Sequence, residues 1–203
     1  MERKMGEPVV NRRILGAKLP LRAMHVWSIR VRLQLERRIR DLALFDVAID
    51  SKLRGCDVVA LRLDDVVTTG SIRSRGTVIQ QKTGRPVQFE ITDQTKRSLL
   101  NWIMRRPDYG GDWLFPSRVN PGSQLSTRQY MRLVKRWVAM AGLEPAAYGT
   151  HSLRRTKVSM LYRKTGNLRA CQLLLGHTKL ESTVRYLGVE LDDALELSER
   201  LEI

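Results

Sequence analysis

Residues 148–156 of the chain read Tyr148-Gly149-Thr150-His151-Ser152-Leu153-Arg154-Arg155-Thr156. His151 and Arg154 lie three residues apart at the expected start of a helix, a spacing that places both side chains on one face. The free N–H groups at a helix N-terminus favour anions. This stretch therefore predicts a phosphate-binding site.

Three further motifs stand in order around it. His177 ends the segment Leu174-Leu175-Gly176-His177, and Tyr186 follows nine residues later. Upstream, Arg54 lies in the segment Ser51-Lys52-Leu53-Arg54-Gly55-Cys56-Asp57, and Lys82 lies in a glycine-containing loop of hairpin length. Each motif alone is weak evidence, but the ordered set is specific. It resembles the tyrosine recombinases, the phage-integrase family, over roughly residues 40–190.

The resemblance implies the catalytic-domain fold of that family, mainly α with a small three-stranded antiparallel sheet. It also implies a site-specific DNA recombinase or integrase that cleaves and rejoins DNA through a 3′-phosphotyrosine intermediate, without metal, ATP or another cofactor. The residues that match the catalytic positions are Arg54, Lys82, His151, Arg154, His177 and Tyr186.

Tyr186 is the candidate nucleophile, and its phenol, with an ordinary pKa of about 10, needs help to lose its proton. His151 is the candidate base or proton partner. Lys82 is the candidate acid for the departing 5′-oxygen, and His177 is expected to donate a hydrogen bond to the phosphate.

Attack on a phosphodiester builds negative charge on the non-bridging oxygens. Two guanidinium groups, those of Arg54 and Arg154, can neutralise this charge through bidentate hydrogen bonds, which lysine cannot form. Because the covalent link conserves the energy of the bond, rejoining needs no ATP.

The chain departs from the family pattern in two places. In the first arginine motif, Asp57 stands where the family usually has Glu, and Lys52 stands where it usually has Gly. The family also carries an N-terminal helical DNA-binding domain, whereas here a basic arm precedes the catalytic part.

Other interpretations of these residues exist. Tyr186 could be a packed aromatic residue, but none of the other tyrosines has its spacing to His177. These rivals are Tyr109, Tyr130, Tyr148 and Tyr162. Lys82 could be a solvated turn residue, and Arg54 could pair with Asp50 or Asp57. Arg155 and Lys157 could touch DNA phosphates or only water. His25 has no acidic or thiol neighbour and is expected to be structural.

The charge balance points to a polyanion. The chain of 203 residues has 36 Lys+Arg and 21 Asp+Glu, a net charge of +15, which favours double-stranded DNA as the partner. By contrast, residues 186–203 contain one basic and six acidic residues. The length fits one domain with its own hydrophobic core.

Cysteine and carboxylate usage argue against metal sites. Cys56 and Cys171 have no CxxC spacing, so we expect two small buried thiols and no disulfide. A two-metal nuclease would need several converging carboxylates, and the body offers only the adjacent pair Asp64 and Asp65. No apolar run reaches the length of a signal peptide or a membrane span. The sequence therefore predicts a soluble, cytoplasmic protein on the bacterial nucleoid, with no membrane partner.

Periodicity predicts the secondary structure. Helices are expected at residues 23–40, 42–53, 57–63, 94–105, 126–142, 152–164, 168–175 and 182–187. Segments 66–67, 77–81 and 87–91 are expected to form the three strands. Thr92 is a plausible N-cap for the helix that follows it.

Three segments are expected along the chain: a basic arm or linker at 1–22, a catalytic domain at 23–188, and an acidic helix or tail at 189–203. Leu191, Leu195 and Leu201 lie near one face of that tail. The resemblance implies that the tail packs into a neighbouring protomer, giving a homo-oligomer, a tetramer on two DNA sites. Folding back onto its own protomer is the alternative.

Two other functions fit parts of the pattern. A type IB topoisomerase-like enzyme would use the same site to relax supercoils without defined targets. A DNA-binding accessory protein of a mobile element would keep the fold but turn over poorly, although the intact set of catalytic residue types argues against this.

Overall fold

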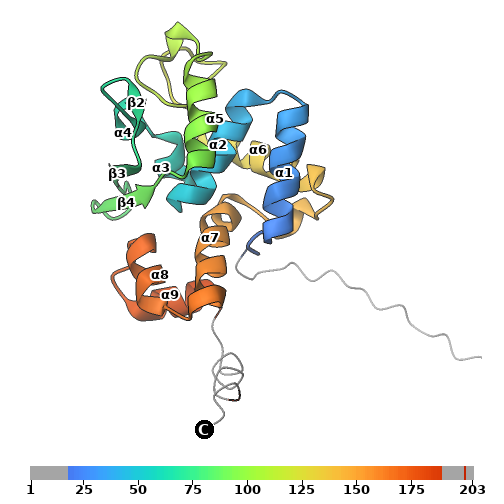
Figure 1. The fold of residues 1–203 in the computed structure, drawn as a ribbon, viewed down its shortest axis with the longest axis vertical. Helices are drawn as coiled ribbons and strands as arrows, with labels where there is room; N and C mark the ends of the chain where they lie inside the picture. Colours follow the sequence, from blue (N-terminus) through green and yellow to red (C-terminus); the bar gives the residue numbers. More distant parts are fainter. Residues whose placement is uncertain (1–17, 189–198, 200–203) are drawn as a thin grey trace, which may run out of the picture.

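The computed structural model describes residues 18–188 and Glu199, and its architecture is mainly helical with small antiparallel sheets, as predicted (Figure 1). The helices are α1 (Ala23–Leu35), α2 (Ile39–Ser51), α3 (Gly55–Val59), α4 (Leu63–Val66), α5 (Asp93–Ile103), α6 (Thr127–Met140), α7 (Thr150–Thr165), α8 (Leu168–Leu175) and α9 (Leu180–Leu187), with 3-10 turns η1 (Asp108–Gly110) and η2 (Pro145–Ala147). The strands are β1 (Val67–Thr68), β2 (Ser71–Ile72), β3 (Arg75–Ile79) and β4 (Pro86–Glu90).

The strands form two separate hairpins, which corrects the prediction of one three-stranded sheet. β1 pairs with β2, and β3 pairs with β4 from Arg75 opposite Glu90 to Ile79 opposite Pro86. Thr69 and Gly70 both have positive φ, of 34° and 78°. This turn folds β1 back onto β2, so β1 pairs locally and is not hydrogen-bonded to the β3–β4 hairpin.

Helix α2 is the centre of the core. Every residue from Arg40 to Ser51 is buried, because α1, α5 and α7 all pack against this helix. Phe45 of α2 meets Trp137 of α6 edge to face, with ring centroids 5.6 Å apart. The predicted helix over residues 23–40 ends at Leu35 instead, where the chain turns through Arg37 at a φ of 51°.

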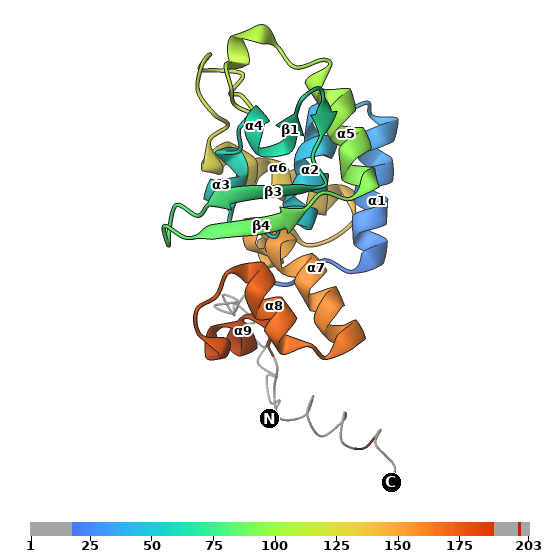
Figure 2. The same cartoon turned by 60° about the vertical axis from the view of Figure 1, so that its left-hand side comes forward.

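Helices α7, α8 and α9 form a small layer under the β3–β4 hairpin (Figure 2). Its own apolar centre contains Val158, Cys171 and Leu175, with Tyr186 packed against it. Cys171 is fully buried as predicted, whereas Cys56 is only half-buried; both are free thiols.

Two buried charges, on Lys52 and Asp50, and two partly exposed ones, on Glu90 and Lys157, connect α2, β4 and α7. The Lys52 ammonium, 1% exposed, lies 2.6 Å from the Glu90 carboxylate, and Lys157 lies 2.6 Å from Asp50 and 2.7 Å from Glu90. Lys52 ends α2 in the left-handed conformation, with a φ of 54°. Glycine adopts this conformation more freely than lysine, but the Lys52 side chain contributes an ion pair here.

The two ends of the chain are described only in part. Of the expected arm, residues 18–22 run along the body: Leu21 is buried, and its N–H donates to Thr156 Oγ1 over 3.0 Å. Lys18 donates to the carbonyl of Ala146 in η2. The expected tail helix lies outside the described residues, apart from Glu199.

Candidate active site

Arg54 lies at the junction of α2 and α3. Its backbone is extended, and its guanidinium Nη1 donates to Oε1 of Gln80 at the end of β3. Neither Asp50 nor Asp57 forms an ion pair with it in the part of the chain that the structure describes. The alternative interpretation of Arg54 as a partner of these carboxylates is therefore wrong.

Lys82 is exposed in the turn of the β3–β4 hairpin, where Asp57 anchors the chain. The Asp57 carboxylate accepts the N–H of Gln81 over 2.9 Å. Lys82, Arg54 and His151 line one hollow of about 430 Å³. Its other lining residues are Gly55, Cys56, Thr127, Arg128, Met131 and Thr150.

Helix α7 carries His151 and Arg154 as the spacing predicts. His151, in the first turn, opens into this hollow, whereas Arg154 is 2% exposed. Arg154 Nη2 donates to the carbonyl of Leu175 over 2.7 Å, which ties α7 to the end of α8. Its Nη1 is buried and has no hydrogen-bond partner among the described residues.

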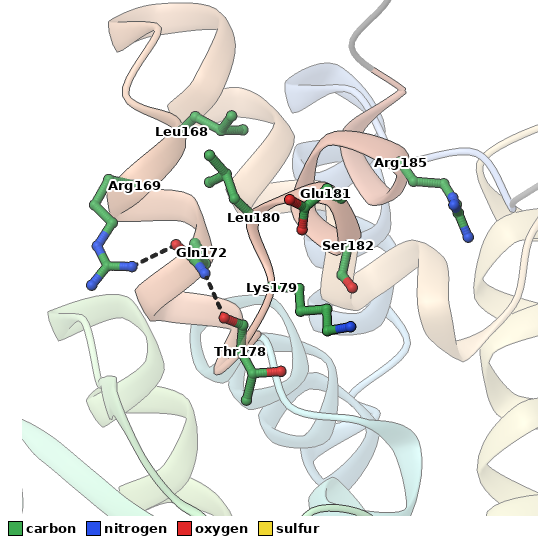
Figure 3. A pocket seen from close by; sticks show the side chains of 9 residues that line it. All are labelled: Leu168, Arg169, Gln172, Thr178, Lys179, Leu180, Glu181, Ser182 and Arg185. Atoms are coloured by element: carbon green, nitrogen blue, oxygen red, sulfur yellow. Dashed lines mark hydrogen bonds between the residues drawn. The ribbon is translucent and has the colours of Figure 1, made fainter.

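His177 lies in the turn between α8 and α9. Gly176, with a φ of 63°, ends α8, and the ring Nδ1 of His177 is hydrogen-bonded to Oγ1 of Thr183 over 3.1 Å. The buried Gln172 holds the turn, because its side chain donates to the carbonyl of Thr178 over 3.2 Å (Figure 3).

A second hollow, of about 1050 Å³, lies between α8 and α9, and Figure 3 shows the side chains that line it. Its lining residues are Leu168, Arg169, Gln172, Thr178, Lys179, Leu180, Glu181, Ser182 and Arg185. None of the six predicted catalytic residues lines this hollow.

Tyr186 packs between an imidazole and two guanidinium groups. Its ring is perpendicular to that of His177, with centroids 5.4 Å apart, and the Cζ atoms of Arg155 and Arg154 lie 5.0 and 5.9 Å from its centroid. Its hydroxyl is buried without a partner among the described residues. Burial raises the pKa of Tyr186 to about 12, against the opposing effect of Arg154 and Arg155.

Burial and the charges of Arg154 and Arg54 lower the pKa of both His177 and His151. Burial, then Arg154 and Arg54, lower the pKa of His177 to about 4. Burial also lowers the pKa of His151, with contributions from Arg154, Arg54, Arg155 and Lys82. Burial and the surrounding cations therefore disfavour the protonated form of both imidazoles.

Sequence reasoning did not assign Asp57, Gln80 or Arg155 to the site. The sequence marks Asp57 as a departure from the family pattern and a possible partner of Arg54, and Arg155 as a possible contact to a DNA phosphate or to water. Arg155 is 7% exposed, and its Nε has no partner among the described residues. Lys157, the other candidate for a DNA contact, pairs with Asp50 and Glu90 instead.

No three His, Cys, Asp or Glu side chains between residues 18 and 188 converge as a metal site. No helix in the same range is long and apolar enough to cross a bilayer.

Comparison with known proteins places the chain. The family model of the phage integrase family matches residues 30–191. Among curated proteins, the tyrosine recombinase XerD of Xanthomonas axonopodis is 44% identical over 153 residues, covering 73% of this chain and 50% of that protein. The probable integrase/recombinase YoeC of Bacillus subtilis is 28% identical over 158 residues, covering 78% of this chain and 82% of that protein.

Solved structures agree on the fold. XerA recombinase matches with a TM-score of 0.75 at 19% identity, covering 92% of this chain and 68% of that one. XerH recombinase bound to its palindromic difH substrate matches with a TM-score of 0.70 at 21% identity, covering 90% and 53%.

The chain thus spans about half the length of the XerC and XerD relatives and most of YoeC. The family model covers most of the chain, and its range includes all six residues from Arg54 to Tyr186 that match the catalytic motifs. The chain therefore belongs to the phage integrase family.

Proposed function

We propose that this chain is a site-specific recombinase or integrase that cleaves and rejoins double-stranded DNA through a 3′-phosphotyrosine link, without metal or ATP. The observation that carries the proposal is the packing of the Tyr186 phenol against Arg154, Arg155 and His177. Of the five tyrosines it is the one held by two guanidinium groups and a histidine, which suits a nucleophile that must become an anion beside a phosphate.

Buried polar atoms without hydrogen-bond partners around Tyr186 support an anionic ligand there. Arg154 Nη1, Arg155 Nε and Tyr186 Oη are all buried without partners among the described residues. Buried donors of this kind are costly unless a ligand completes them. A DNA phosphate supplies the acceptor oxygens that the two guanidinium groups lack.

The proposed step forms one bond, breaks another and transfers two protons. Tyr186 Oη attacks the phosphorus, a tyrosine–phosphate bond forms, and the bond from phosphorus to the 5′-oxygen breaks. The phenol proton passes to the neutral imidazole of His151, and Lys82 protonates the departing oxygen. Arg54 and Arg154 neutralise the charge on the non-bridging oxygens, and His177 donates a hydrogen bond to one of them. Attack by a DNA 5′-hydroxyl on the link reverses the step.

The proposed partners are double-stranded DNA and further copies of the chain. XerH and the Tn1549 transposon integrase were solved on DNA, and the lambda integrase as a dimer on a core site. We propose a tetramer on two DNA sites, held by the acidic residues 189–203, acting on DNA in the bacterial cytoplasm. Deleting residues 190–203 is expected to reduce cooperative gel shifts and to spare binding of one protomer; unchanged cooperativity would contradict the role of the tail.

Covalent trapping tests the reaction. The protein is incubated with EDTA and nicked duplexes tiled across the DNA that flanks its own gene, and adducts that survive denaturant are counted. We expect adducts with the unaltered protein and none with Tyr186→Phe. Tyr162→Phe is the matched control, because Tyr162 packs against the same apolar cluster as Tyr186.

The outcomes separate the alternatives. Adducts that also appear with Tyr186→Phe, or that require a divalent metal, would overturn the proposed mechanism. Exchange of strands between two duplexes supports a recombinase, whereas relaxation of supercoils without exchange identifies the topoisomerase-like alternative. A Tyr186→Phe protein that binds DNA and supports the same recombination in cells would identify an accessory protein.

A further inference from the structure

Gln80, at the end of β3, is a buried polar residue with an unusual set of contacts. It is 0% exposed, and a buried amide needs hydrogen-bond partners. Its backbone carbonyl accepts the N–H groups of Thr83, over 3.2 Å, and Gly84, over 2.8 Å, which shapes the turn that presents Lys82. The backbone of Gln80 is therefore part of the Lys82 loop.

The side chain of Gln80 reaches in the opposite direction, to Arg54. Its Oε1 accepts from Nη1 of Arg54 and, over 3.0 Å, from Oγ1 of Thr83. One oxygen thus joins the guanidinium of Arg54 to the turn that carries Lys82, although 26 residues separate Arg54 from Gln80 in sequence.

The amide nitrogen of Gln80 faces a third element. Nε2 is buried and has no partner among the described residues. A Cβ atom at Gly176 would lie 3.4 Å from this Nε2 and 2.7 Å from Cγ2 of Val87, so the turn before His177 packs directly on the amide. Turning the amide over would point its N–H groups at the Arg54 donor, and for this reason the orientation is set by Arg54.

We propose that Gln80 is a positioning residue of the cleavage reaction, which holds the guanidinium of Arg54 and the Lys82 turn in one arrangement against the His177 turn. This inference rests on the proposed function. Burying the Gln80 amide with its nitrogen unpaired lowers the free energy of unfolding. The orientation that leaves Nε2 unpaired is the one in which Oε1 accepts from Arg54. Gln80 itself need not touch the phosphate.

The test compares two matched variants of the full chain on the nicked duplex that gives the most adduct with the unaltered protein. Gln80→Met removes the amide at similar volume, and Gln81→Met makes the same change at the exposed neighbouring position. We expect Gln80→Met to slow single-turnover adduct formation about 10- to 100-fold, the scale of a lost hydrogen bond to a charged group. The dissociation constant for that duplex should change by less than about threefold.

A double-mutant cycle supplies a readout that a purely structural role would not move. If Gln80 acts through Arg54, adding Gln80→Met to Arg54→Lys should slow the reaction by less than about threefold further. Multiplicative losses would overturn the proposal, as would a Gln80→Met rate equal to that of Gln81→Met.

Variants of Thr83 test the same bridge independently of Gln80. Thr83 is exposed, so Thr83→Val tests the same bridge even where Gln80→Met does not fold; it should slow cleavage several-fold, and Thr83→Ser should restore the rate. Equal rates for the two Thr83 variants would overturn the bridge. A complete absence of adduct with the unaltered protein would overturn the proposed function, and this inference with it.

Discussion

The guanidinium of Arg155 lies over the ring of Tyr186, with its Cζ 5.0 Å from the ring centroid. The same side chain is 7% exposed and leaves Nε without a partner among the described residues. A cation over an aromatic ring stabilises it by electrostatic attraction, and this cation lowers the pKa of the Tyr186 phenol, against the larger, opposing effect of burial. Arg155 therefore favours the anionic form of the proposed nucleophile.

Arg155→Ala should slow adduct formation about 3- to 30-fold at pH 7, which corresponds to a desolvated cation–π contact. The loss should shrink as the pH rises, because more of the phenol is then ionised without help. Single-turnover rates from pH 6 to 10 measure both effects. Arg163→Ala, which removes an exposed charge from the same helix, is the control, and an equal loss in that variant would contradict a specific role for Arg155.

Lys82→Ala should slow cleavage of an ordinary phosphodiester about 10²- to 10⁴-fold, the usual contribution of a general acid. A substrate with sulfur in place of the bridging 5′-oxygen needs little protonation, since thiols ionise near pH 8.5. The variant should therefore cleave that substrate at nearly the rate of the unaltered protein. Arg85→Ala, in the same hairpin loop, should show no such rescue, and a Lys82→Ala defect that persists with sulfur would exclude Lys82 as the acid.

His177 should make the folded state sensitive to acid. Burial lowers its pKa from 6.5 to about 4, so between these values the unfolded chain binds more protons than the folded one. The free energy of unfolding is then fully retained above pH 6.5 and falls as the pH drops toward 4. Because the ring is only half-buried, screening reduces the effect to about 1 kcal/mol.

The measurement is urea unfolding of the unaltered chain and His177→Gln at pH 7.5 and pH 4.5. The variant should lose about 1 kcal/mol less between the two pH values. His25→Gln is the comparison variant: His25 accepts the N–H of Arg22 in the first turn of α1, and burial and Arg22 lower its pKa by less than that of His177, so its effect on the pH slope should be smaller. Identical pH slopes for His177→Gln and the unaltered chain would refute the assignment.

Lys52 should contribute to stability through its ion pair more than through its backbone. Lys52→Ala removes a buried ammonium 2.6 Å from Glu90, and we expect a loss of about 2 to 3 kcal/mol, below the usual cost of breaking a buried pair because Lys157 still faces Glu90. Lys52→Gly should lose about 1 kcal/mol less, since glycine adopts the left-handed φ of 54° without strain. Urea denaturation ranks the two variants, and a glycine variant no more stable than the alanine variant would contradict the strain argument.

Local signals predicted most of the helices. Thr92 caps α5, accepting the N–H of Thr95 as its sequence position indicates, and Gly166 and Gly176 end α7 and α8 in the left-handed conformation. The strands were predicted less well, because the segments are short and their pairing depends on the Thr69–Gly70 turn. The β-branched composition of these segments indicates strands, but it does not reveal a turn in which two successive residues have positive φ.

The sequence by itself determined the family and the candidate residues, because the order Arg54, Lys82, His151, Arg154, His177 and Tyr186 is a one-dimensional property of the chain. Only the tertiary structure decided how these side chains are held. Asp57 on the Lys82 hairpin, Gln80 on Arg54 and Arg155 over Tyr186 are contacts between residues about 24 to 31 positions apart. Such contacts form when α2, α7 and the hairpin pack around a common core, and burial then sets the pKa values of His177 and Tyr186 through desolvation and the charges nearby.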